Sequence, residues 1–514
     1  MSLGRTWTVS LLGLSGHLVE VEAQMNQGLP AFALVGLPDT AVNEARERVR
    51  AAVTSSSVTW PQQRMTVNLS PASLPKTGTG LDLAMAVAVL VAAGLPARER
   101  AARTVHLGEL GLDGRLHPVR GILPAVSAAV TAGRPEVVVP TGNADEARLV
   151  PGAEVRAVDH LAELIVDYGG EATRPDGAAP EPPVDPRPPA PLVVPDLRDV
   201  RGQEEARFAL EVAAAGGHHL FLLGAPGTGK SMLAARLPGI LPDLAEPDAV
   251  EVSAVHSISG TLDAAAGLLR RPPFEDPHHT ATAAAVVGGG SGFPRPGAAS
   301  RAHRGVLLLD EAPEFAPRVL QTLRQPLEHG ELVLQRATGS ARYPARFQLV
   351  LAANPCPCGK ATGKGLDCRC TPLERRRYVG RLSGPLLDRI DIQVDVPAVT
   401  RASLAIAGPS EPSAAVAARV AAARDRQRER LAGTGWRTNA EVPGSWLRGD
   451  DGGLPPDVRL ALERALDRGA LSMRGLDRVL RLAWTLADLA EQDRPTVQDV
   501  GTALALRHRG GGDG

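Results

Sequence analysis

The stretch HHLFLLGAPGTGKS, His218–Ser231, joins a short apolar run to a glycine-rich turn that ends in Lys-Ser. The turn has the phosphate-loop spacing Gly-x4-Gly-Lys-Ser/Thr, and it lies between a strand pattern and a helix pattern. Glycines let backbone N–H groups curl around phosphate oxygens at a helix N-terminus. We therefore expect a nucleotide to be bound by Gly224, Ala225, Pro226, Gly227, Thr228, Gly229, Lys230 and Ser231.

Two acidic residues complete the expected reaction centre. The run GVLLLDEAPEF places Asp310 and Glu311 at the end of a buried strand pattern. Lys230 would bring a positive charge to the β- and γ-phosphates, while Ser231 and Asp310 would hold Mg²⁺. Glu311 would polarise the attacking water. An acidic pair alone could cap a helix, but its combination with the phosphate loop predicts ATP hydrolysis with ATP and Mg²⁺ as cofactors.

The patterns around these motifs indicate two folded units. The runs GVLLLDE and ARFQLVLAAN are continuously apolar and are flanked by helix patterns, which is typical of a parallel sheet covered on both faces. From Thr400 onward, apolar residues recur at i, i+3 or i+4 between polar breaks. We expect an α/β nucleotide-binding core at 196–400 and a helical lid at 401–514.

A third unit precedes them. Strand patterns such as FALVGLP and MTVNLS alternate with helix patterns such as TAVNEARERVRAAV in residues 1–170, which predicts an α/β or α+β domain. The segment 171–195 holds nine prolines in 25 residues. Proline excludes helix and central strand, so this segment is predicted to be a semi-rigid linker.

The composition of the chain limits the classes of protein to which it can belong. A chain of 514 residues with 44% hydrophobic content is long enough for several domains. The net charge of −1 argues against a generally basic surface for nucleic acid, yet it leaves room for a local basic channel.

The N-terminus lacks the pattern of a signal peptide, because His17 and Glu20 interrupt its apolar run. The apolar stretch from Leu81 is short for a membrane span. We expect a cytoplasmic protein with no membrane partner.

Downstream of the phosphate loop the sequence resembles the AAA+ ATPases. Asn354 ends the apolar run FQLVLAANP, Arg389 follows LLD in LSGPLLDRIDI, and Arg474 lies in SMRGLDR. The resemblance implies that Asn354 is the first sensor, Arg474 the second sensor and Arg389 the finger that reaches the γ-phosphate of a neighbouring subunit. A finger supplied in trans implies a ring, a homohexamer.

The run from Phe274 to Glu311 and the run from Leu327 to Gly359 are similar to the magnesium-chelatase-like subgroup, and more narrowly to the YifB/ComM proteins. The resemblance implies a ring-forming motor on single-stranded or branched DNA, a branch-migration helicase in homologous recombination and natural transformation, with recombination proteins as partners. A chelatase-type ATPase that remodels a protein partner and an ATP-dependent Lon-like protease are the alternatives. His278 and His279 belong to these strings. Adjacent histidines cannot easily face one ion, so a structural or positional role is expected.

The N-terminal unit resembles the Lon protease domain, an α/β fold of the ribosomal S5 domain 2-like type. The resemblance is found in two segments, VNLSPASLPKTGTGLDLAMAVAVL and LGELGLDGRLHPVRGILPA. Gly80 stands where that family has its nucleophilic Ser, and Leu123 where it has its Lys. Covalent peptide hydrolysis then has neither nucleophile nor base, so a non-proteolytic domain for assembly or substrate binding is expected. Ser70 and Ser73 with Lys76 form a weaker candidate for a displaced dyad.

The run GELVLQRATGSARYPARFQ reads as two strands around a Gly-Ser turn, flanked by Arg336 and Arg342. In a ring these arginines would face DNA phosphates across the pore. The alternative is a solvated hairpin with ordinary surface arginines.

All four cysteines lie in an insertion at 356–370: Cys356, Cys358, Cys368 and Cys370. Two Cys-x-Cys pairs nine residues apart can supply four thiolates to Zn²⁺, although this spacing is tighter than that of the usual knuckle. Free thiols and redox sensing are the alternatives. Residues 360–381 carry seven Lys and Arg against two acidic residues, which favours a DNA-contacting surface.

Overall fold

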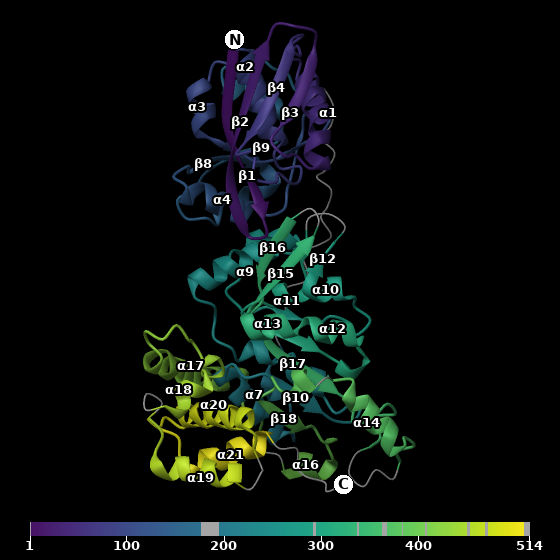
Figure 1. The fold of residues 1–514 in the computed structure, drawn as a ribbon, viewed down its shortest axis with the longest axis vertical. Helices are drawn as coiled ribbons and strands as arrows, with labels where there is room; N and C mark the ends of the chain where they lie inside the picture. The colour runs from purple at the N-terminus through teal and green to yellow at the C-terminus, as the bar shows by residue number, and fades with distance from the viewer. Residues whose placement is uncertain are drawn as a thin grey trace.

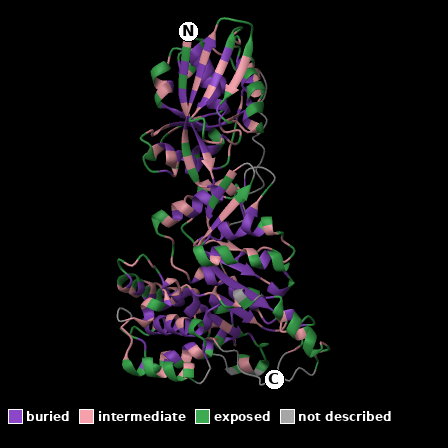
Figure 2. Ribbon diagram, viewed as in Figure 1, coloured by how far each residue is buried: buried purple, intermediate pink, exposed green. Residues whose placement is uncertain are grey.

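The computed structural model of the chain is elongated, with an N-terminal α/β part, a central α/β part and a helical part near the C-terminus (Figure 1). The structure describes residues 2–175, 195–290, 294–336, 339–361, 367–382, 384–406, 409–449, 453–467 and 471–507. Most of the predicted linker at 171–195 therefore lies outside the described residues. Buried residues gather along the sheets and the inner sides of the helices in all three parts (Figure 2).

The N-terminal part is built on a seven-stranded sheet with the order β3-β4-β2-β1-β5-β8-β9. Its strands are β1 (Ser2–Leu12), β2 (Ser15–Asn26), β3 (Ala31–Val35), β4 (Arg64–Ser70), β5 (Val105–His106), β8 (Glu136–Pro140) and β9 (Glu154–Val158). The small strands β6 (Glu109–Leu110) and β7 (Leu116–His117) pair beside it. The accompanying helices are α1 (Thr40–Ser55), α2 (Asp82–Ala93), α3 (Arg98–Arg103), α4 (Ile122–Thr131), α5 (Ala144–Arg148) and α6 (Leu161–Asp167).

Two helices cover opposite faces of the long hairpin β1–β2. Gly4 lies against the backbone of α2, whereas Gly16 lies against Ala128 of α4. Successive side chains of a strand point to opposite faces, so apolar residues on both sides of β1 and β2 are buried. The apolar run from Leu81 is the buried helix that the sequence predicts. Among the described helices, none has the length and apolar character to cross a membrane.

The central part holds a parallel five-stranded sheet with the order β11-β14-β17-β10-β18. These strands are β10 (Leu220–Leu223), β11 (Phe274–Glu275), β14 (Val306–Leu309), β17 (Gln348–Ala353) and β18 (Ile392–Asp395). Helices of this part are α7 (Glu204–Gly216), α8 (Lys230–Ala234), α9 (Glu246–Ser259), α10 (Ala283–Val287), α11 (Ala298–Arg301), α12 (Pro317–Thr322), α13 (Arg324–His329), α14 (Pro372–Gly380), α15 (Gly384–Leu387) and α16 (Arg401–Ile406). Two buried clusters occupy its opposite faces, so the predicted parallel sheet covered on both sides is confirmed.

The helical part contains α17 (Ser413–Arg430), α18 (Gly444–Arg448), α19 (Pro456–Asp467), α20 (Met473–Leu489) and α21 (Val497–Arg507). Its described residues form helices and connections, as the sequence predicts. A buried polar network ties α20 to the sheet, because His218 lies 3.1 Å from Asp391 Oδ2 and 2.8 Å from Thr485 Oγ1. The lid and the nucleotide-binding core therefore share one interior.

A hairpin of β15 (Glu331–Arg336) and β16 (Gly339–Pro344) projects from the central part toward the N-terminal part (Figure 1). The predicted Gly-Ser turn is wrong. Gly339 and Ser340 belong to β16 and pair with Arg336 and Gln335. Residues 337–338, between the two strands, lie outside the described residues.

The N-terminal part rests on this hairpin and on α9. Gly13, at the β1–β2 turn, has φ +66° and lies so close to the Arg342 backbone that a Cβ atom there would meet the Arg342 carbonyl oxygen at 2.6 Å. The Gly121 amide donates to the Ser257 carbonyl at 3.3 Å, and Ala254 of α9 is buried in a cluster with α4. Movements of the hairpin and of the N-terminal part are thus mechanically connected.

Candidate functional site

A cavity opens at the carboxyl ends of three adjacent parallel strands, β10, β14 and β17. Its volume is about 360 Å³. Ligands of open α/β sheets bind at this edge, because the strand order brings the loops after the strands together there. The cavity is lined by Pro226, Gly227, Gly229, Lys230, Ser231, Met232, Asp310, Glu311, Ala353 and Asn354.

The loop after β10 has the backbone that phosphate binding requires. Gly227 and Gly229 have φ angles of +76° and +92°, which favour glycine. Gly224 is packed so closely that a Cβ atom would lie 2.4 Å from the Val396 carbonyl oxygen. Gln203 braces the loop from outside, since its Nε2 donates to the Thr228 carbonyl at 2.6 Å.

Lys230 is nearly buried and bonds within the loop. Its Nζ donates to the carbonyls of Gly224 at 2.8 Å and Ala225 at 2.9 Å, and to Asn354 Oδ1 at 3.1 Å. Burial lowers the pKa of Lys230, while the negative charges of Asp310 and Glu311 act against that shift. An ammonium held at this point can exchange carbonyl oxygens for phosphate oxygens when a nucleotide enters.

Ser231 and Asp310 meet across the cavity, where the Ser231 hydroxyl donates to Asp310 Oδ2. The Glu311 amide donates to Asp310 Oδ1 at 2.8 Å, and this bond orients the carboxylate. A hydroxyl and a carboxylate beside a phosphate site are the oxygen ligands that Mg²⁺ takes with few protein partners. These residues therefore fit the expected Mg²⁺ position.

His279 reaches the same site, which the sequence did not predict. Its Nδ1 lies 3.1 Å from Glu311 Oε2, and its ring stacks on His278 with centroids 4.1 Å apart. Glu311 itself has φ +50°, in the left-handed region. The contact joins the segment after β11 to the loop after β14. No short-range pattern in the sequence predicts such a contact. A purely structural role for His279 is therefore too narrow.

Replacing His279 with alanine is expected to raise the rate of ATP hydrolysis when ATP and Mg²⁺ are the only ligands present. This ion-pair contact occupies the Glu311 carboxylate, and such a contact contributes about 0.2–1 kcal/mol, or about 1.4- to 5-fold in rate. Steady-state phosphate release measures the effect. His278→Ala is the matched control, since its ring nitrogen bonds to Thr280 instead. A lower rate in His279→Ala than in the control would show that His279 assists Glu311.

Arg389 and Arg474 are not among the described residues that line the cavity. Arg389 follows α15 and forms an ion pair with Glu328 of α13. Arg474, in the first turn of α20, lies 3.3 Å from Asp388 Oδ2. Burial and the positive charges of Arg324 and Arg474 lower the pKa of Arg389. The finger and second-sensor assignments stay predictions.

Arg336 and Arg342 are exposed on the hairpin. Arg342 lies 3.5 Å from Glu331 Oε1 on the paired strand, and its side chain is 73% exposed. The Arg336 guanidinium lies beside Gly289, where a Cβ atom would be 3.1 Å from Nη2. The hairpin thus contacts the β12 (Gly288–Gly289) and β13 (Arg295–Pro296) pair, in a segment that continues from His278 and His279. A DNA role for either arginine stays a prediction.

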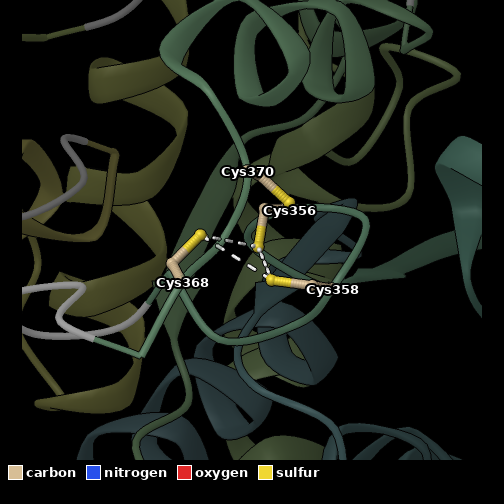
Figure 3. A group of neighbouring side chains, drawn as sticks. All are labelled: Cys356, Cys358, Cys368 and Cys370. Carbon is tan, nitrogen blue, oxygen red and sulfur yellow. Dashed lines mark hydrogen bonds between the residues drawn. The ribbon is translucent and has the colours of Figure 1, made fainter.

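The four cysteines, Cys356, Cys358, Cys368 and Cys370, are free thiols gathered in one place (Figure 3). Their sulfur atoms lie within 4.8 Å of one another. Backbone amides, first Lys360 and then Arg369, donate to the Cys358 sulfur and lower its pKa to about 6. Residues 362–366 of the predicted insertion lie outside the described residues.

The N-terminal part contains no dyad around the weaker candidate residues. Lys76 is buried, and its Nζ donates to the Pro71 carbonyl. Within the described residues, neither the Ser70 nor the Ser73 hydroxyl bonds to it. The Gly80 carbonyl accepts from the Gly108 amide at 3.0 Å, and Leu123 is buried in α4.

Three family models for magnesium chelatase match successive parts of the chain. Subunit ChlI of Mg-chelatase matches residues 21–143, magnesium chelatase, subunit ChlI, matches 196–404, and its C-terminal model matches 410–507. Together they cover most of the three parts of the fold.

Full-length relatives are also similar. An uncharacterized protein of Mycobacterium tuberculosis is 51% identical, with 99% of each chain covered. The uncharacterized protein YifB of Escherichia coli is 39% identical, covering 99% of this chain and 97% of YifB. Competence protein ComM of Haemophilus influenzae is 39% identical, covering 99% of this chain and 98% of ComM. A weaker match, 26% identical to the Lon protease of Trichlorobacter lovleyi, covers 32% of this chain and 21% of that protease.

Proposed function

The chain belongs to the magnesium-chelatase-like AAA+ family that includes YifB and ComM, and within it we propose a ring-forming ATP-driven motor that acts on DNA. The predicted fold class is confirmed: an AAA+ core with a helical lid follows an N-terminal α/β domain with weak Lon similarity. Membership in this family implies ATPase activity with ATP and Mg²⁺.

One observation carries the ATP assignment. Lys230, Asp310, Glu311 and Asn354 come from three separate loops, yet all line one cavity at the carboxyl edge of the sheet. The positive charge, the Mg²⁺ ligands and the water-polarising carboxylate are then within reach of one triphosphate. We propose that Asn354, bonded to Lys230, senses the γ-phosphate.

The proposed ring rests on Arg389. In a single subunit this residue is paired with Glu328 and lies outside the cavity lining, so its charge can serve an ATP only in a neighbouring subunit. Closed rings of identical subunits supply such heterologous contacts at every interface. We propose a homohexamer.

The proposed DNA contact rests on the projecting hairpin. In a ring, Arg336 and Arg342 of each subunit would form a repeated band of cations for a phosphate backbone. The basic segment 360–381 would add a second contact surface. Branch migration of joint DNA molecules during recombination, including natural transformation, is the proposed activity. The similarity to competence protein ComM supports the link to natural transformation.

The N-terminal domain is proposed to assist assembly or substrate binding. Gly80 has no side chain to attack a peptide, and the buried Leu123 has no amine to act as a base. Its contacts with α9 and with the hairpin support a mechanical role.

The four-cysteine group is proposed as a Zn²⁺ site, because its sulfurs are close enough for one tetrahedral ion. Zinc would then be the third cofactor beside ATP and Mg²⁺.

A second candidate is a chelatase-type ATPase that remodels a protein partner, and the match to subunit ChlI favours it. Phosphate release with single-stranded DNA, forked DNA and no DNA separates the two candidates. The DNA motor predicts stimulation by DNA and movement of a branched junction by the wild type but not by Lys230→Ala. Absence of both DNA binding and DNA stimulation would contradict it.

Replacing Arg342 with alanine is expected to weaken DNA binding equally for all sequences. Each lost phosphate contact reduces the slope of log K against log salt concentration by about 1. Fluorescence anisotropy with labelled forked DNA at several salt concentrations measures both quantities. Arg148→Ala, which removes the same charge from the exposed surface of the N-terminal domain, is the control. Equal slopes for wild type and Arg342→Ala would place the DNA elsewhere.

A further inference from the structure

The four cysteine sulfurs are spaced for one metal ion. Cys356 Sγ lies 3.4 Å from Cys358 Sγ, and Cys368 Sγ lies 3.7 Å from each of them (Figure 3). A tetrahedral ion with Zn–S bonds of about 2.3 Å separates its sulfurs by about 3.8 Å. A disulfide needs about 2.05 Å. The spacing therefore suits a shared ion and excludes bonded pairs.

The surroundings of these sulfurs differ from those of ordinary buried cysteines. Cys356 is buried, but Cys358 is exposed and the other two are half-buried. Backbone amides are directed at three of the sulfurs: Lys360 and Arg369 donate to Cys358, Cys370 donates to Cys368, and Cys358 donates to Cys370. Amides placed in this way can orient metal ligands.

The cysteine group is built against the phosphate loop. Cys356 lies two residues after Asn354, whose side chain accepts from Lys230 Nζ at 3.1 Å. Gly359 follows Cys358 with φ +75°, and its backbone touches Pro226 of the phosphate loop. A Cβ atom at residue 359 would lie 2.5 Å from the Pro226 ring. One wall of the ATP cavity is thus supported by the turn between the cysteine pairs.

The other end of the group reaches the loop that carries Glu311. Helix α14 begins directly after Cys370 and Thr371, and Arg375 Nε donates to the Cys370 carbonyl at 3.2 Å. Arg381 after this helix lies 3.1 Å from Glu314 and donates to the Pro313 carbonyl at 3.3 Å. The cysteine segment therefore contacts the phosphate loop through Gly359 and the segment after Glu311 through the end of α14.

We propose that Cys356, Cys358, Cys368 and Cys370 hold one Zn²⁺ as four thiolates, and that this ion keeps the phosphate loop and Asn354 in the geometry that ATP hydrolysis needs. Four sulfur ligands in a tetrahedron select zinc or iron, and zinc makes closed structural sites without redox change. Binding releases the thiol protons to solvent. The dependence of hydrolysis on zinc rests on the proposed ATP site, whereas zinc binding itself does not.

The test uses the full-length protein purified under reducing conditions. Elemental analysis measures zinc per chain, fluorescent-nucleotide titration measures ATP affinity, and phosphate release measures turnover with Mg²⁺ in excess. The variants are Cys358→Ser with Cys368→Ser, to remove the ion, and Gly359→Ala, to disturb the contact with Pro226 while keeping the ligands. Asp425→Ser, which changes an exposed acidic residue of α17 outside the cysteine segment, is the control.

The wild type and Asp425→Ser are expected to carry about one zinc per chain and to hydrolyse ATP alike. The double serine variant is expected to lose zinc and to hydrolyse ATP about tenfold or more slowly, since small displacements of reacting groups have effects of this size. Gly359→Ala should keep zinc but lose turnover. If the serine variant does not fold, a zinc-selective chelator on the wild type gives the same comparison, with rescue by added zinc.

Less than half an equivalent of zinc in the wild type, or iron in its place, would overturn the metal assignment. Unchanged ATP affinity and turnover after complete loss of zinc would overturn the connection to the ATP site. Zinc bound without any ATP hydrolysis, with or without DNA, would instead contradict the proposed function and leave the metal site standing.

Discussion

Lys230→Ala is expected to reduce ATP hydrolysis by about 10²–10³-fold, because it removes a preorganised positive charge from the site of the β- and γ-phosphates. The side chain bridges Gly224, Ala225 and Asn354, so the phosphate loop also loses its internal brace. Phosphate release with and without forked DNA measures the loss, and fluorescent-nucleotide titration should show weakened ATP binding.

Glu311→Gln provides the matched comparison. The amide keeps the shape of the side chain but cannot polarise water as a carboxylate does, so hydrolysis should fall while ATP binding persists. The two variants therefore separate the binding of the triphosphate from its cleavage. Hydrolysis at the wild-type rate in Lys230→Ala would mean that the cavity is not the ATP site.

Arg389→Ala is expected to have a larger effect still, a loss of about 10³–10⁵-fold in turnover with ATP binding retained. An arginine finger stabilises the charge of the transition state and contributes little to binding of the ground state. Here Arg389 is held by Glu328, close to Arg324 and Arg474, at a position away from its own cavity. We therefore expect Arg389 to serve the ATP site of a neighbouring subunit.

Mixing two inactive variants tests the contribution in trans. Lys230→Ala subunits have an intact finger, whereas Arg389→Ala subunits have an intact phosphate loop. In randomly mixed rings about one interface in four joins both intact halves, so partial activity should return. If size-exclusion chromatography shows mixed rings but phosphate release stays at the level of the separate variants, Arg389 does not act across the interface.

Much of this fold could be predicted because its signals are local. Continuous apolar runs indicate buried strands, and β10, β14 and β17 follow those runs closely. The phosphate loop depends on glycines within one turn, so its spacing is readable from eight consecutive residues. Asp310 and Asn354 each follow such a strand, and parallel strands end at one edge, so their convergence with Lys230 also followed from sequence.

The prediction of the hairpin turn failed, because a shift of a few residues in strand pairing moves the turn. The hairpin turn was expected at Gly339-Ser340, but both residues pair with β15 as part of a strand. Glycine permits a turn without requiring one, and the pairing of Leu332 with Tyr343, both buried, decides the register.

The sequence by itself determined the family and the order of the three parts, and it predicted the residues that line the cavity apart from Met232 and Ala353. These features depend on motifs and apolar runs that are local in the sequence. Only the tertiary structure decided that His279 bonds to Glu311, that Gly359 supports Pro226 and that Gly13 rests on Arg342. These contacts join residues that are distant in sequence. Their distances are set by how the loops pack against the sheet, and no periodicity or short-range spacing encodes that packing.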